Sequence, residues 1–270
     1  MTAMCLCHLV LAVAQLSAAE PVAIEGLHGL GDVRHHAIVS AEADHRYHVL
    51  VGLPRDYDED ARYPVVYVLD GGALFPMLRT YQRYLRLGEE TPDVIMVGIS
   101  YGTSDWQAGN NRSHDFTAPS EEREFWGGAG DFHAFLEREL IPGIEAAYAA
   151  DADRRVIFGQ SLGGQFVLYA AQTRPELFHG YIASNPALHR NLGFFLEQVP
   201  AEASGHARVF VAGGSNDDPV YREPALEWIE AWTTRSSLPW KLEILSLDGH
   251  SHFSAPPASY RAGMRWLFTP

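Results

Sequence analysis

A serine flanked by glycines lies between a short, mainly apolar segment and a helix-forming run. Residues 159–164 have the sequence Gly-Gln-Ser-Leu-Gly-Gly; residues 155–158 precede them and the apolar residues 166–171 follow. A Gly-x-Ser-x-Gly pattern in a strand–turn–helix context is typical of a sharp turn that exposes a nucleophilic serine. Glycine relieves the crowding of such a turn because it has no Cβ. We therefore predict that Ser161 is a nucleophile; the alternative is a glycine-rich turn whose serine only caps a helix.

Short apolar segments alternate with longer helical patterns from residue 35 onward. This alternation is the signature of a mostly parallel sheet with helices on both faces. About eight strands are expected, near residues 37–39, 47–51, 64–69, 93–99, 155–158, 180–183, 208–212 and 242–246. No internal repeat, low-complexity tract or linker interrupts the pattern, so we predict a single α/β domain.

Helical patterns fill the intervals between the expected strands. Over residues 132–149 the apolar spacing is that of a helix with Asp131 as its N-cap, and Pro142 predicts a kink or a break. The connection between the strands ending near Ala183 and starting near Arg208 is only about two dozen residues long, so we expect no large lid domain. The other helices are expected near residues 73–87, 192–198, 221–234 and 257–268.

The first residues differ in composition from the rest of the chain. Met4 to Leu16 is an apolar run without a charge, and Ser17, Ala18 and Ala19 follow it. Small residues in these positions suit cleavage by a signal peptidase, and the run is shorter than the ~20 residues that span a bilayer. We predict a signal peptide over residues 1–19 and a periplasmic or secreted domain over residues 20–270. A wrongly assigned start codon and a leader that tethers the chain to a membrane are the alternatives.

Cysteine content and charge exclude several kinds of chemistry. Cys5 and Cys7 are the only two cysteines, and both lie in the expected leader, so the mature chain would have neither a disulfide nor a cysteine nucleophile. The net charge of −14 disfavours nucleic acids and anionic membrane surfaces as partners. We therefore expect a small-molecule partner, with no nucleic acid and no stable insertion into a membrane.

A serine hydroxyl needs a base to remove its proton during attack. After a serine of this kind, the acid and then the histidine follow along the chain, each on a loop after a strand. The loop at residues 213–218 follows an expected strand and ends in two aspartates. We predict Asp217 as the acid and keep Asp218 as the second choice. A turn stabilised by aspartate hydrogen bonds to its own backbone is the alternative.

The loop at residues 248–254 lies between the last expected strand and the terminal helix. It contains His250 and His252, and either could be the general base. Two histidines at this spacing could also share a metal ion, but no carboxylate or third histidine is placed to complete the site. We therefore predict that the protein uses no metal and no other cofactor.

An ester carbonyl under attack becomes an oxyanion, which needs hydrogen-bond donors already in place. The backbone N–H of Leu162, directly after the serine, is one expected donor. The second should come from the loop at residues 70–73, which has the sequence Asp-Gly-Gly-Ala and follows the strand at residues 64–69. We predict Gly72 as that donor; a tight turn before a helix is compatible with the same role.

Residues 101–130 form the longest segment without a regular pattern, and aromatic residues occur in it among polar ones. Loops of this length are usually functional or mobile. We predict that Trp106, Arg112 and Trp126 contact the substrate. The alternative is a loop that packs its aromatic side chains onto the body of the domain.

With these residues identified, the chain resembles the "Putative esterase" branch of the α/β-hydrolases, which includes esterase D, enterobactin and salmochelin esterases, and mycolyltransferases. The resemblance covers nearly all of residues 35–269 and implies a single-domain α/β-hydrolase fold. It selects His252 over His250, whereas family members that work with a Ser–His dyad leave the role of Asp217 open. Its motifs lie at residues 53–71, 97–99, 112–117, 159–164, 184–186 (with Asn185 in place of a commoner serine) and 252–268.

The resemblance and the site residues together predict a serine ester hydrolase that works through an acyl-enzyme. Siderophore esters and acylated sugars are both candidate substrates. An acyltransferase of the same fold and a non-catalytic binding protein are the alternatives. Arg79, Arg83 and Arg86 lie on the helix after the predicted oxyanion loop, where they would either meet an anionic ligand or be solvated.

Overall fold

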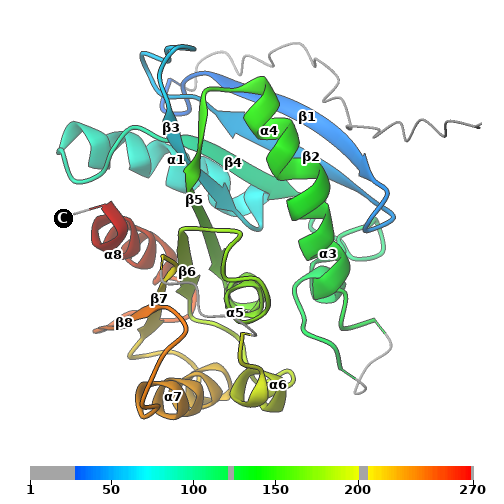
Figure 1. The fold of residues 1–270 in the computed structure, drawn as a ribbon, viewed down its shortest axis with the longest axis vertical. Coiled ribbons are helices and arrows are strands. Elements are labelled where there is room, and N and C mark those ends of the chain that lie inside the picture. The colour runs from blue at the N-terminus through cyan, green and yellow to red at the C-terminus, as the bar shows by residue number, and fades with distance from the viewer. Residues whose placement is uncertain (1–27, 121–124, 201–205, 269–270) are drawn as a thin grey trace, which may run out of the picture.

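Eight strands form one sheet in the computed structural model, which describes residues 28–120, 125–200 and 206–268 (Figure 1). The order across the sheet is β1-β2-β4-β3-β5-β6-β7-β8. The expected leader at residues 1–19, with both cysteines and the cleavage position near Ala19, lies outside the described residues. The strands are β1 (Val33–Ser40), β2 (His45–Gly52), β3 (Tyr63–Val68), β4 (Ile95–Ser100), β5 (Ala150–Gln160), β6 (Gly180–Ser184), β7 (Arg208–Gly214) and β8 (Lys241–Leu247).

Strand directions determine where a site can form. β1 pairs with β2 and β2 with β4 in antiparallel fashion, whereas every pairing from β4 through β8 is parallel. The carboxyl ends of six strands, β3 to β8, therefore meet at one edge of the sheet, which is where open α/β sheets bind ligands. The predicted mostly parallel sheet of about eight strands is confirmed.

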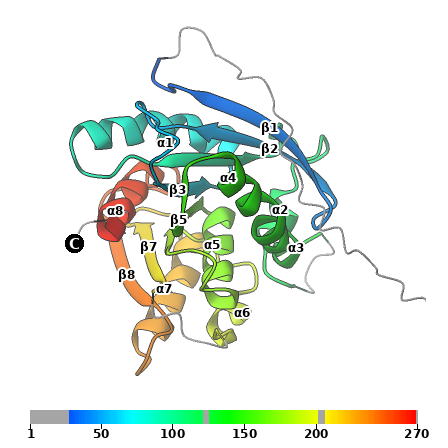
Figure 2. The ribbon, with the colours of Figure 1, turned by 45° about the horizontal axis from the view of Figure 1, so that its top comes forward.

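Helices cover both faces of the sheet (Figures 1 and 2). α1 and α8 pack together on one face, and α5 packs on the other, with α3 and α6 beside it. The described part of the connection between β6 and β7 holds only the short helix α6. No helix among the described residues is long and apolar enough to cross a membrane. The helices are α1 (Gly71–Leu87), α2 (Arg112–Asp115), α3 (Ala129–Phe135), α4 (Ile141–Ala147), α5 (Leu162–Thr173), α6 (Leu192–Glu197), α7 (Pro219–Thr233) and α8 (Pro256–Phe268).

The central strands are apolar on both sides because both faces of the sheet are covered. In β3, Val65 and Tyr67 belong to the hydrophobic core under α5, whereas Val66 and Val68 belong to the core under α1 and α8. All four side chains are fully buried. Burial of a side chain of this size contributes about 1.5–3 kcal/mol, so this strand alone anchors both layers.

The helix expected over residues 132–149 is interrupted in the structure. α3 begins earlier, with Gly128 as its N-cap, so the prediction that Asp131 caps the helix is wrong. A π-helical turn, Leu136–Leu140, separates α3 from α4, and Pro142 lies in the first turn of α4. Proline cannot donate a hydrogen bond to the preceding turn, and the wider turn ahead of it accommodates that loss.

Candidate active site

Ser161 lies at the turn between β5 and α5 with a backbone conformation that few residues adopt. Its φ is 60° and its ψ is −118°, a strained combination that persists only where the surroundings impose it. A Cβ on Gly159 would lie 2.2 Å from the carbonyl oxygen of Gly163, and one on Gly164 would lie 2.9 Å from that of Ser184. Only glycine fits at these two positions. The sequence pattern thus encodes a tight strand–serine–helix turn.

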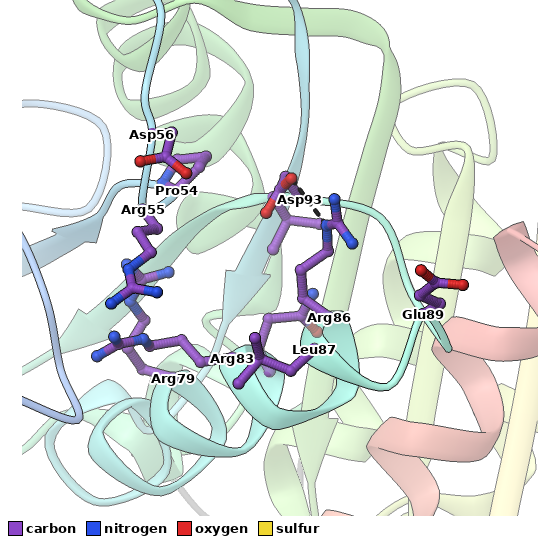
Figure 3. A pocket seen from close by; sticks show the side chains of 11 residues that line it. Pro54, Arg55, Asp56, Arg79, Arg83, Arg86, Leu87, Glu89 and Asp93 are labelled. Carbon is purple, nitrogen blue, oxygen red and sulfur yellow. Dashed lines mark hydrogen bonds and ion pairs between the residues drawn. The ribbon is translucent and has the colours of Figure 1, made fainter.

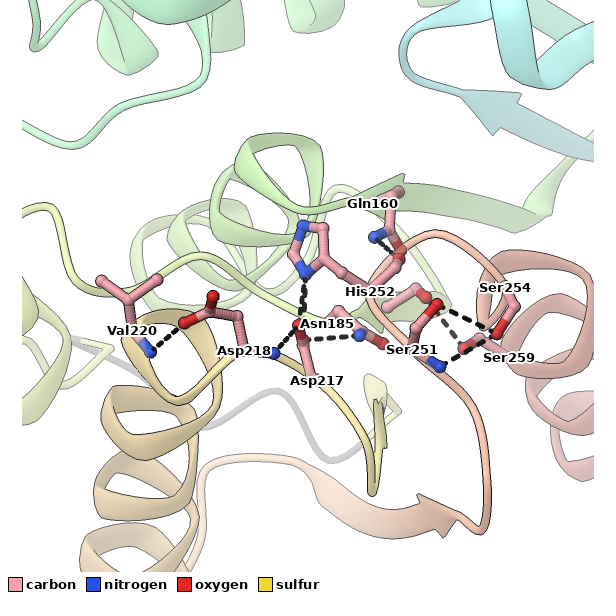
Figure 4. A network of polar contacts seen from close by, with 10 residues as sticks. Gln160, Asn185, Asp217, Asp218, Val220, Ser251, His252, Ser254 and Ser259 are labelled. Atoms are coloured by element: carbon pink, nitrogen blue, oxygen red, sulfur yellow. Dashed lines mark hydrogen bonds and ion pairs between the residues drawn. The ribbon is translucent and has the colours of Figure 1, made fainter.

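Asp217 and His252 come together from the loops after β7 and β8. Nδ1 of His252 lies 2.9 Å from Oδ2 and 3.1 Å from Oδ1 of Asp217, and both side chains are buried (Figure 4). A carboxylate at this distance favours the tautomer in which Nδ1 carries the proton. Nε2 then keeps its lone pair, which is the state that a general base requires.

The structure gives different contacts to the neighbouring candidates for the acid and for the base. Asp218 is the N-cap of α7, and its Oδ1 accepts a 3.0 Å hydrogen bond from the backbone N–H of Val220. Nδ1 of His250 lies 3.1 Å from the carbonyl oxygen of Ser254 on the exposed loop. Of the two aspartates, the structure therefore brings Asp217 to His252, and Asp218 has a local structural contact instead.

Three further residues position this pair, and the sequence did not indicate their roles. The amide of Asn185 donates to Oδ2 of Asp217 at 2.7 Å, and that of Gln160 donates to the carbonyl oxygen of His252 at 2.7 Å. The ring of Tyr221 stacks on the imidazole of His252, with 4.4 Å between ring centroids. Asn185 and Gln160 stand at the carboxyl ends of β6 and β5, and that position was the only signal available from the sequence.

The two expected oxyanion donors stand at the beginnings of helices. Leu162 is the first residue of α5 and Gly72 the second residue of α1. The first N–H groups of a helix have no partner within the helix, and the helix dipole favours negative charge there. The left-handed backbone of Asp70, with φ 52°, turns the chain from β3 into α1. Both helix starts thus lie at the edge of the sheet that carries Ser161.

Ser161 and His252 line one cavity of about 670 Å³. Gly72 also lines it, so one of the expected oxyanion donors borders the same space. The size is within the range of small-molecule sites, about 300–1,000 Å³. The remaining lining includes polar side chains and two aromatic ones, among them Ser100, Tyr101, Thr103, Ser104, Asn110 and Phe253.

Arg112, a predicted substrate contact, lines this cavity but is bound to another side chain. Its guanidinium forms a two-pronged ion pair with Asp70, at 2.7 and 2.9 Å. Burial by itself would lower the pKa of Arg112, but the hydrogen bond to Asp70 and the negative charge of Asp70 together outweigh that effect and raise the pKa. α2 is held in turn because Asp115 accepts hydrogen bonds from the hydroxyls of Tyr47 and Tyr101. The charge of Arg112 is therefore neutralised inside the cavity.

The two predicted tryptophan contacts lie elsewhere. Trp106 is 76% exposed and is not among the residues lining the cavity of Ser161. Trp126 does not line it either, and the guanidinium of Arg190 lies 4.5 Å from its ring centroid. Phe116 packs into the core under α5, so part of this loop anchors to the domain. Phe253, which the sequence analysis did not single out, lines the cavity and is 88% exposed.

Comparison with known protein families assigns the chain to one of them. The model of the "Putative esterase" family matches residues 40–266. The chain belongs to this family. As a family member it is an esterase, a carboxylic ester hydrolase, as its named relatives are.

One relative and two solved structures resemble this esterase over most of their length. It is 29% identical to ferri-bacillibactin esterase BesA of Bacillus subtilis over 254 residues, which cover 86% of this chain and 88% of that protein. The crystal structure of the BES protein from Bacillus cereus superposes with a TM-score of 0.73 at 26% identity, covering 87% of this chain and 95% of the other. The enterobactin and salmochelin hydrolase IroE shares the fold, with a TM-score of 0.69 at 21% identity, covering 89% and 96%.

No metal site accompanies the esterase residues in the part of the chain that the structure describes. No three His, Cys, Asp or Glu side chains come together there as a metal ion would require. His250 and His252, the pair considered as ligands, turn to different partners, Ser254 and Asp217.

Proposed function

We propose that Ser161, His252 and Asp217 form the catalytic triad of this esterase. The observation that carries the proposal is the buried contact of Asp217 with Nδ1 of His252, beside the cavity that His252 and Ser161 both line. Asp217 keeps Nδ1 protonated and stabilises the imidazolium that forms during the reaction. Nε2 of His252 is then the base that serves Ser161.

In the first half of the reaction, Oγ of Ser161 attacks the ester carbonyl carbon while its proton passes to Nε2 of His252. The carbonyl oxygen becomes an oxyanion, and the backbone N–H groups of Leu162 and Gly72 donate hydrogen bonds to it. One such donor is typically worth about 3 kcal/mol in the transition state. The imidazolium then gives its proton to the alcohol oxygen as the C–O bond breaks.

In the second half, a water molecule replaces the alcohol. His252 removes a proton from it, the resulting hydroxide attacks the acyl carbon, and the proton returns to Oγ of Ser161 as the acid leaves. A cavity of about 670 Å³ with several polar side chains in its lining supports hydrolysis because it leaves room for water beside the acyl group. Product analysis with and without a sugar acceptor distinguishes hydrolysis from acyl transfer.

Within this function, the substrate is a small-molecule ester without net charge at the groups facing the cavity. The charged side chains that line the cavity besides His252 are Asp70 and Arg112, and they neutralise each other. A ferric tricatecholate complex carries several negative charges, and an overall charge of −14 would repel it. The iron-free form of a siderophore ester and an acylated sugar both satisfy this requirement. Apo-salmochelin esterase is named for an iron-free siderophore and favours the first, whereas ferri-bacillibactin esterase BesA is named for a ferric one, so both forms belong in the substrate screen.

Export is part of the same proposal. The apolar run from Met4 to Leu16 and the small residues Ser17 to Ala19 support a signal peptide over residues 1–19 and a mature esterase domain over residues 20–270 in the periplasm or outside the cell. The intact mass of the protein recovered from those fractions is the test. Cleavage after Ala19 leaves a chain that begins at Glu20, whereas a full-length chain in the cytoplasm contradicts export.

Turnover of p-nitrophenyl acetate and butyrate tests the catalytic proposal. We expect Ser161→Ala to lower kcat by at least ~10⁴-fold, the size of effect that follows removal of a triad member. The matched control is Ser236→Ala, which removes the hydroxyl of an exposed serine in the loop between α7 and β8. Equal turnover by wild type and Ser161→Ala would remove Ser161 from the mechanism.

A further inference from the structure

A second cavity, of about 260 Å³, lies beside α1 and near the ends of β2 and β4 that are remote from the serine (Figure 3). Its lining includes Asp93 and Val94, directly before β4, whereas the cavity of Ser161 begins at Ser100, where β4 ends. Along α1, Arg83 lies roughly 16 Å from Gly72 at 1.5 Å per residue. This second cavity is therefore separate from the active site. We call it the arginine cavity.

Four arginines line the arginine cavity, and only one of them has a carboxylate partner. Arg86 pairs with Asp93 at 2.8 Å. Arg55, Arg79 and Arg83 form no ion pair with any carboxylate in the described part of the chain. Asp56 and Glu89 also line the cavity; Figure 3 shows Asp56 next to Pro54 and Glu89 apart from the other labelled side chains. Three arginines that form no ion pair with a carboxylate of the described residues therefore line one cavity.

All three unpaired arginines line the same cavity, and two of their guanidinium groups lie close together. A Cβ placed on Gly31 would lie 3.5 Å from Nη2 of Arg79 and 3.7 Å from Nη1 of Arg83. Arg79 is only 3% exposed. Burial, together with the neighbouring charge of Arg83, lowers the pKa of Arg79 to about 10. Arg79 therefore stays protonated at neutral pH, and an anion bound between the guanidinium groups would relieve their mutual repulsion.

Backbone contacts use only part of their hydrogen-bonding capacity. Nε of Arg79 donates to the carbonyl oxygen of Leu30 at 3.0 Å, and its Nη2 donates to that of Leu53. Nη1 of Arg83 donates to the carbonyl oxygen of His28. A guanidinium has five N–H donors, so more than half of the donors on these two groups remain available. The backbone contacts hold the guanidinium groups in place without neutralising them.

We propose that the arginine cavity binds a phosphate oxyanion through Arg55, Arg79 and Arg83. Planar guanidinium groups match the oxygen pairs of phosphate, and several of them facing one point suit its two negative charges. The volume exceeds that of a bare phosphate ion, so a small phosphate ester also fits. The arginine cavity takes no part in ester hydrolysis and binds its ligand independently of Ser161.

Isothermal titration calorimetry of the full chain tests the arginine cavity at constant ionic strength. Inorganic phosphate and glycerol 3-phosphate are titrated separately, which distinguishes the free ion from an ester as the better ligand. We expect saturable binding of one or both to wild type and at least tenfold weaker binding to the Arg55→Gln, Arg83→Gln double variant. The control is Arg46→Gln, which removes an exposed arginine of β2 outside the cavity and should bind as wild type does.

Two further measurements separate loss of binding from loss of fold. The double variant should hydrolyse p-nitrophenyl butyrate at the wild-type rate, since neither arginine lines the cavity of Ser161. Leu87→Glu leaves all the arginines in place and adds a negative charge at a residue that lines the arginine cavity and is 72% exposed. We expect about fivefold weaker phosphate binding from this like-charge repulsion. The absence of saturable heat with wild type, or wild-type affinity in both cavity variants, would overturn the proposal.

Discussion

The side-chain amide of Asn185 donates a hydrogen bond of 2.7 Å to Oδ2 of Asp217, the same oxygen that lies 2.9 Å from Nδ1 of His252. The backbone N–H of Asp218 donates to the other oxygen, Oδ1, at 2.7 Å. Two hydrogen-bond donors besides the imidazole therefore fix the plane of the Asp217 carboxylate. Asn185 can stand there because its φ of 41° is one that asparagine tolerates better than most residues.

Removal of the Asn185 amide should weaken catalysis without unfolding the protein. Asn185→Gly keeps the positive φ at little cost, so the loss comes from the missing hydrogen bond to a charged group, worth about 1.5–3 kcal/mol. We expect kcat for p-nitrophenyl butyrate to fall by about tenfold or more, with KM nearly unchanged. A wild-type kcat for this variant would show that Asp217 needs no support from Asn185.

Substitution of Asp217 and substitution of Asp218 should have different effects on catalysis. Asp217→Asn removes the carboxylate that fixes the tautomer of His252, and we expect kcat to fall by about 10²–10⁴-fold at an unchanged melting temperature. Asp218→Asn alters only the N-cap of α7, where asparagine caps about as well as aspartate, so activity and stability should stay near wild type. The reverse ranking of kcat would identify Asp218 as the acid.

The ion pair between Asp70 and Arg112 should set the preference for substrate charge. Wild type should favour a neutral butyrate ester over a singly charged succinate ester, because Asp70 cancels the charge of Arg112. Asp70→Asn leaves the cation uncompensated, and a change of ~1 kcal/mol should raise relative kcat/KM for the succinate ester about fivefold. Asparagine also tolerates the left-handed backbone of residue 70. An unchanged ratio of the two kcat/KM values would contradict this role.

Substitution of a glycine in the turn at Ser161 should destabilise the protein far more than substitution of a glycine elsewhere. Gly159→Ala would place a Cβ 2.2 Å from a carbonyl oxygen, and we expect a loss of more than about 2 kcal/mol in the free energy of unfolding. Gly213→Ala in β7 is the control, since nothing lies within 4 Å of its Cβ position. Urea unfolding of both variants measures the difference. Equal stabilities would mean that the turn at Ser161 can relax around a side chain.

The stability of the protein should fall in mild acid because of His133. Burial lowers the pKa of this histidine to about 4, whereas the unfolded chain has the ordinary value of 6.5. Between these values the unfolded state binds the extra proton, so the free energy of unfolding decreases as the pH falls from about 6.5 towards 4. Between pH 7.5 and pH 5, the free energy of unfolding of wild type should fall by about 2 kcal/mol more than that of His133→Asn. Parallel losses in urea unfolding would contradict the assignment to His133.

The fold and the tight turn at Ser161 could be predicted because their signals are local. The strands are short apolar runs, and the turn at Ser161 needs glycines at fixed spacings, so both are visible in a single segment. The choices between Asp217 and Asp218 and between His250 and His252 depended on contacts across the sheet, such as that of Gln160 with the histidine loop. Residues one or two apart cannot be separated from spacing alone when tertiary contacts orient them.

The start of α3 and the side-chain contacts of residues 101–130 could not be predicted, because both also depend on tertiary structure. Aspartate is a common N-cap residue, but α3 begins two residues before Asp131, at Ala129, with Gly128 as its N-cap. In the segment of residues 101–130, aromatic composition could not show that Phe116 enters the core while Trp106 faces solvent. Side-chain destinations in a long loop depend on what the rest of the domain leaves uncovered.

Acylation of Ser161 with His252 as its base can be observed by trapping the acyl-enzyme. Wild type, Ser161→Ala and His252→Asn are each mixed with p-nitrophenyl acetate and quenched in acid within the first turnover, and the acetylated residue is located by tandem mass spectrometry. We predict a single acetyl group on Ser161 in wild type, none in Ser161→Ala, and a strongly slowed appearance in His252→Asn. An acetyl group on another residue that forms at the rate of turnover, or full-speed acetylation without the imidazole, would contradict the account.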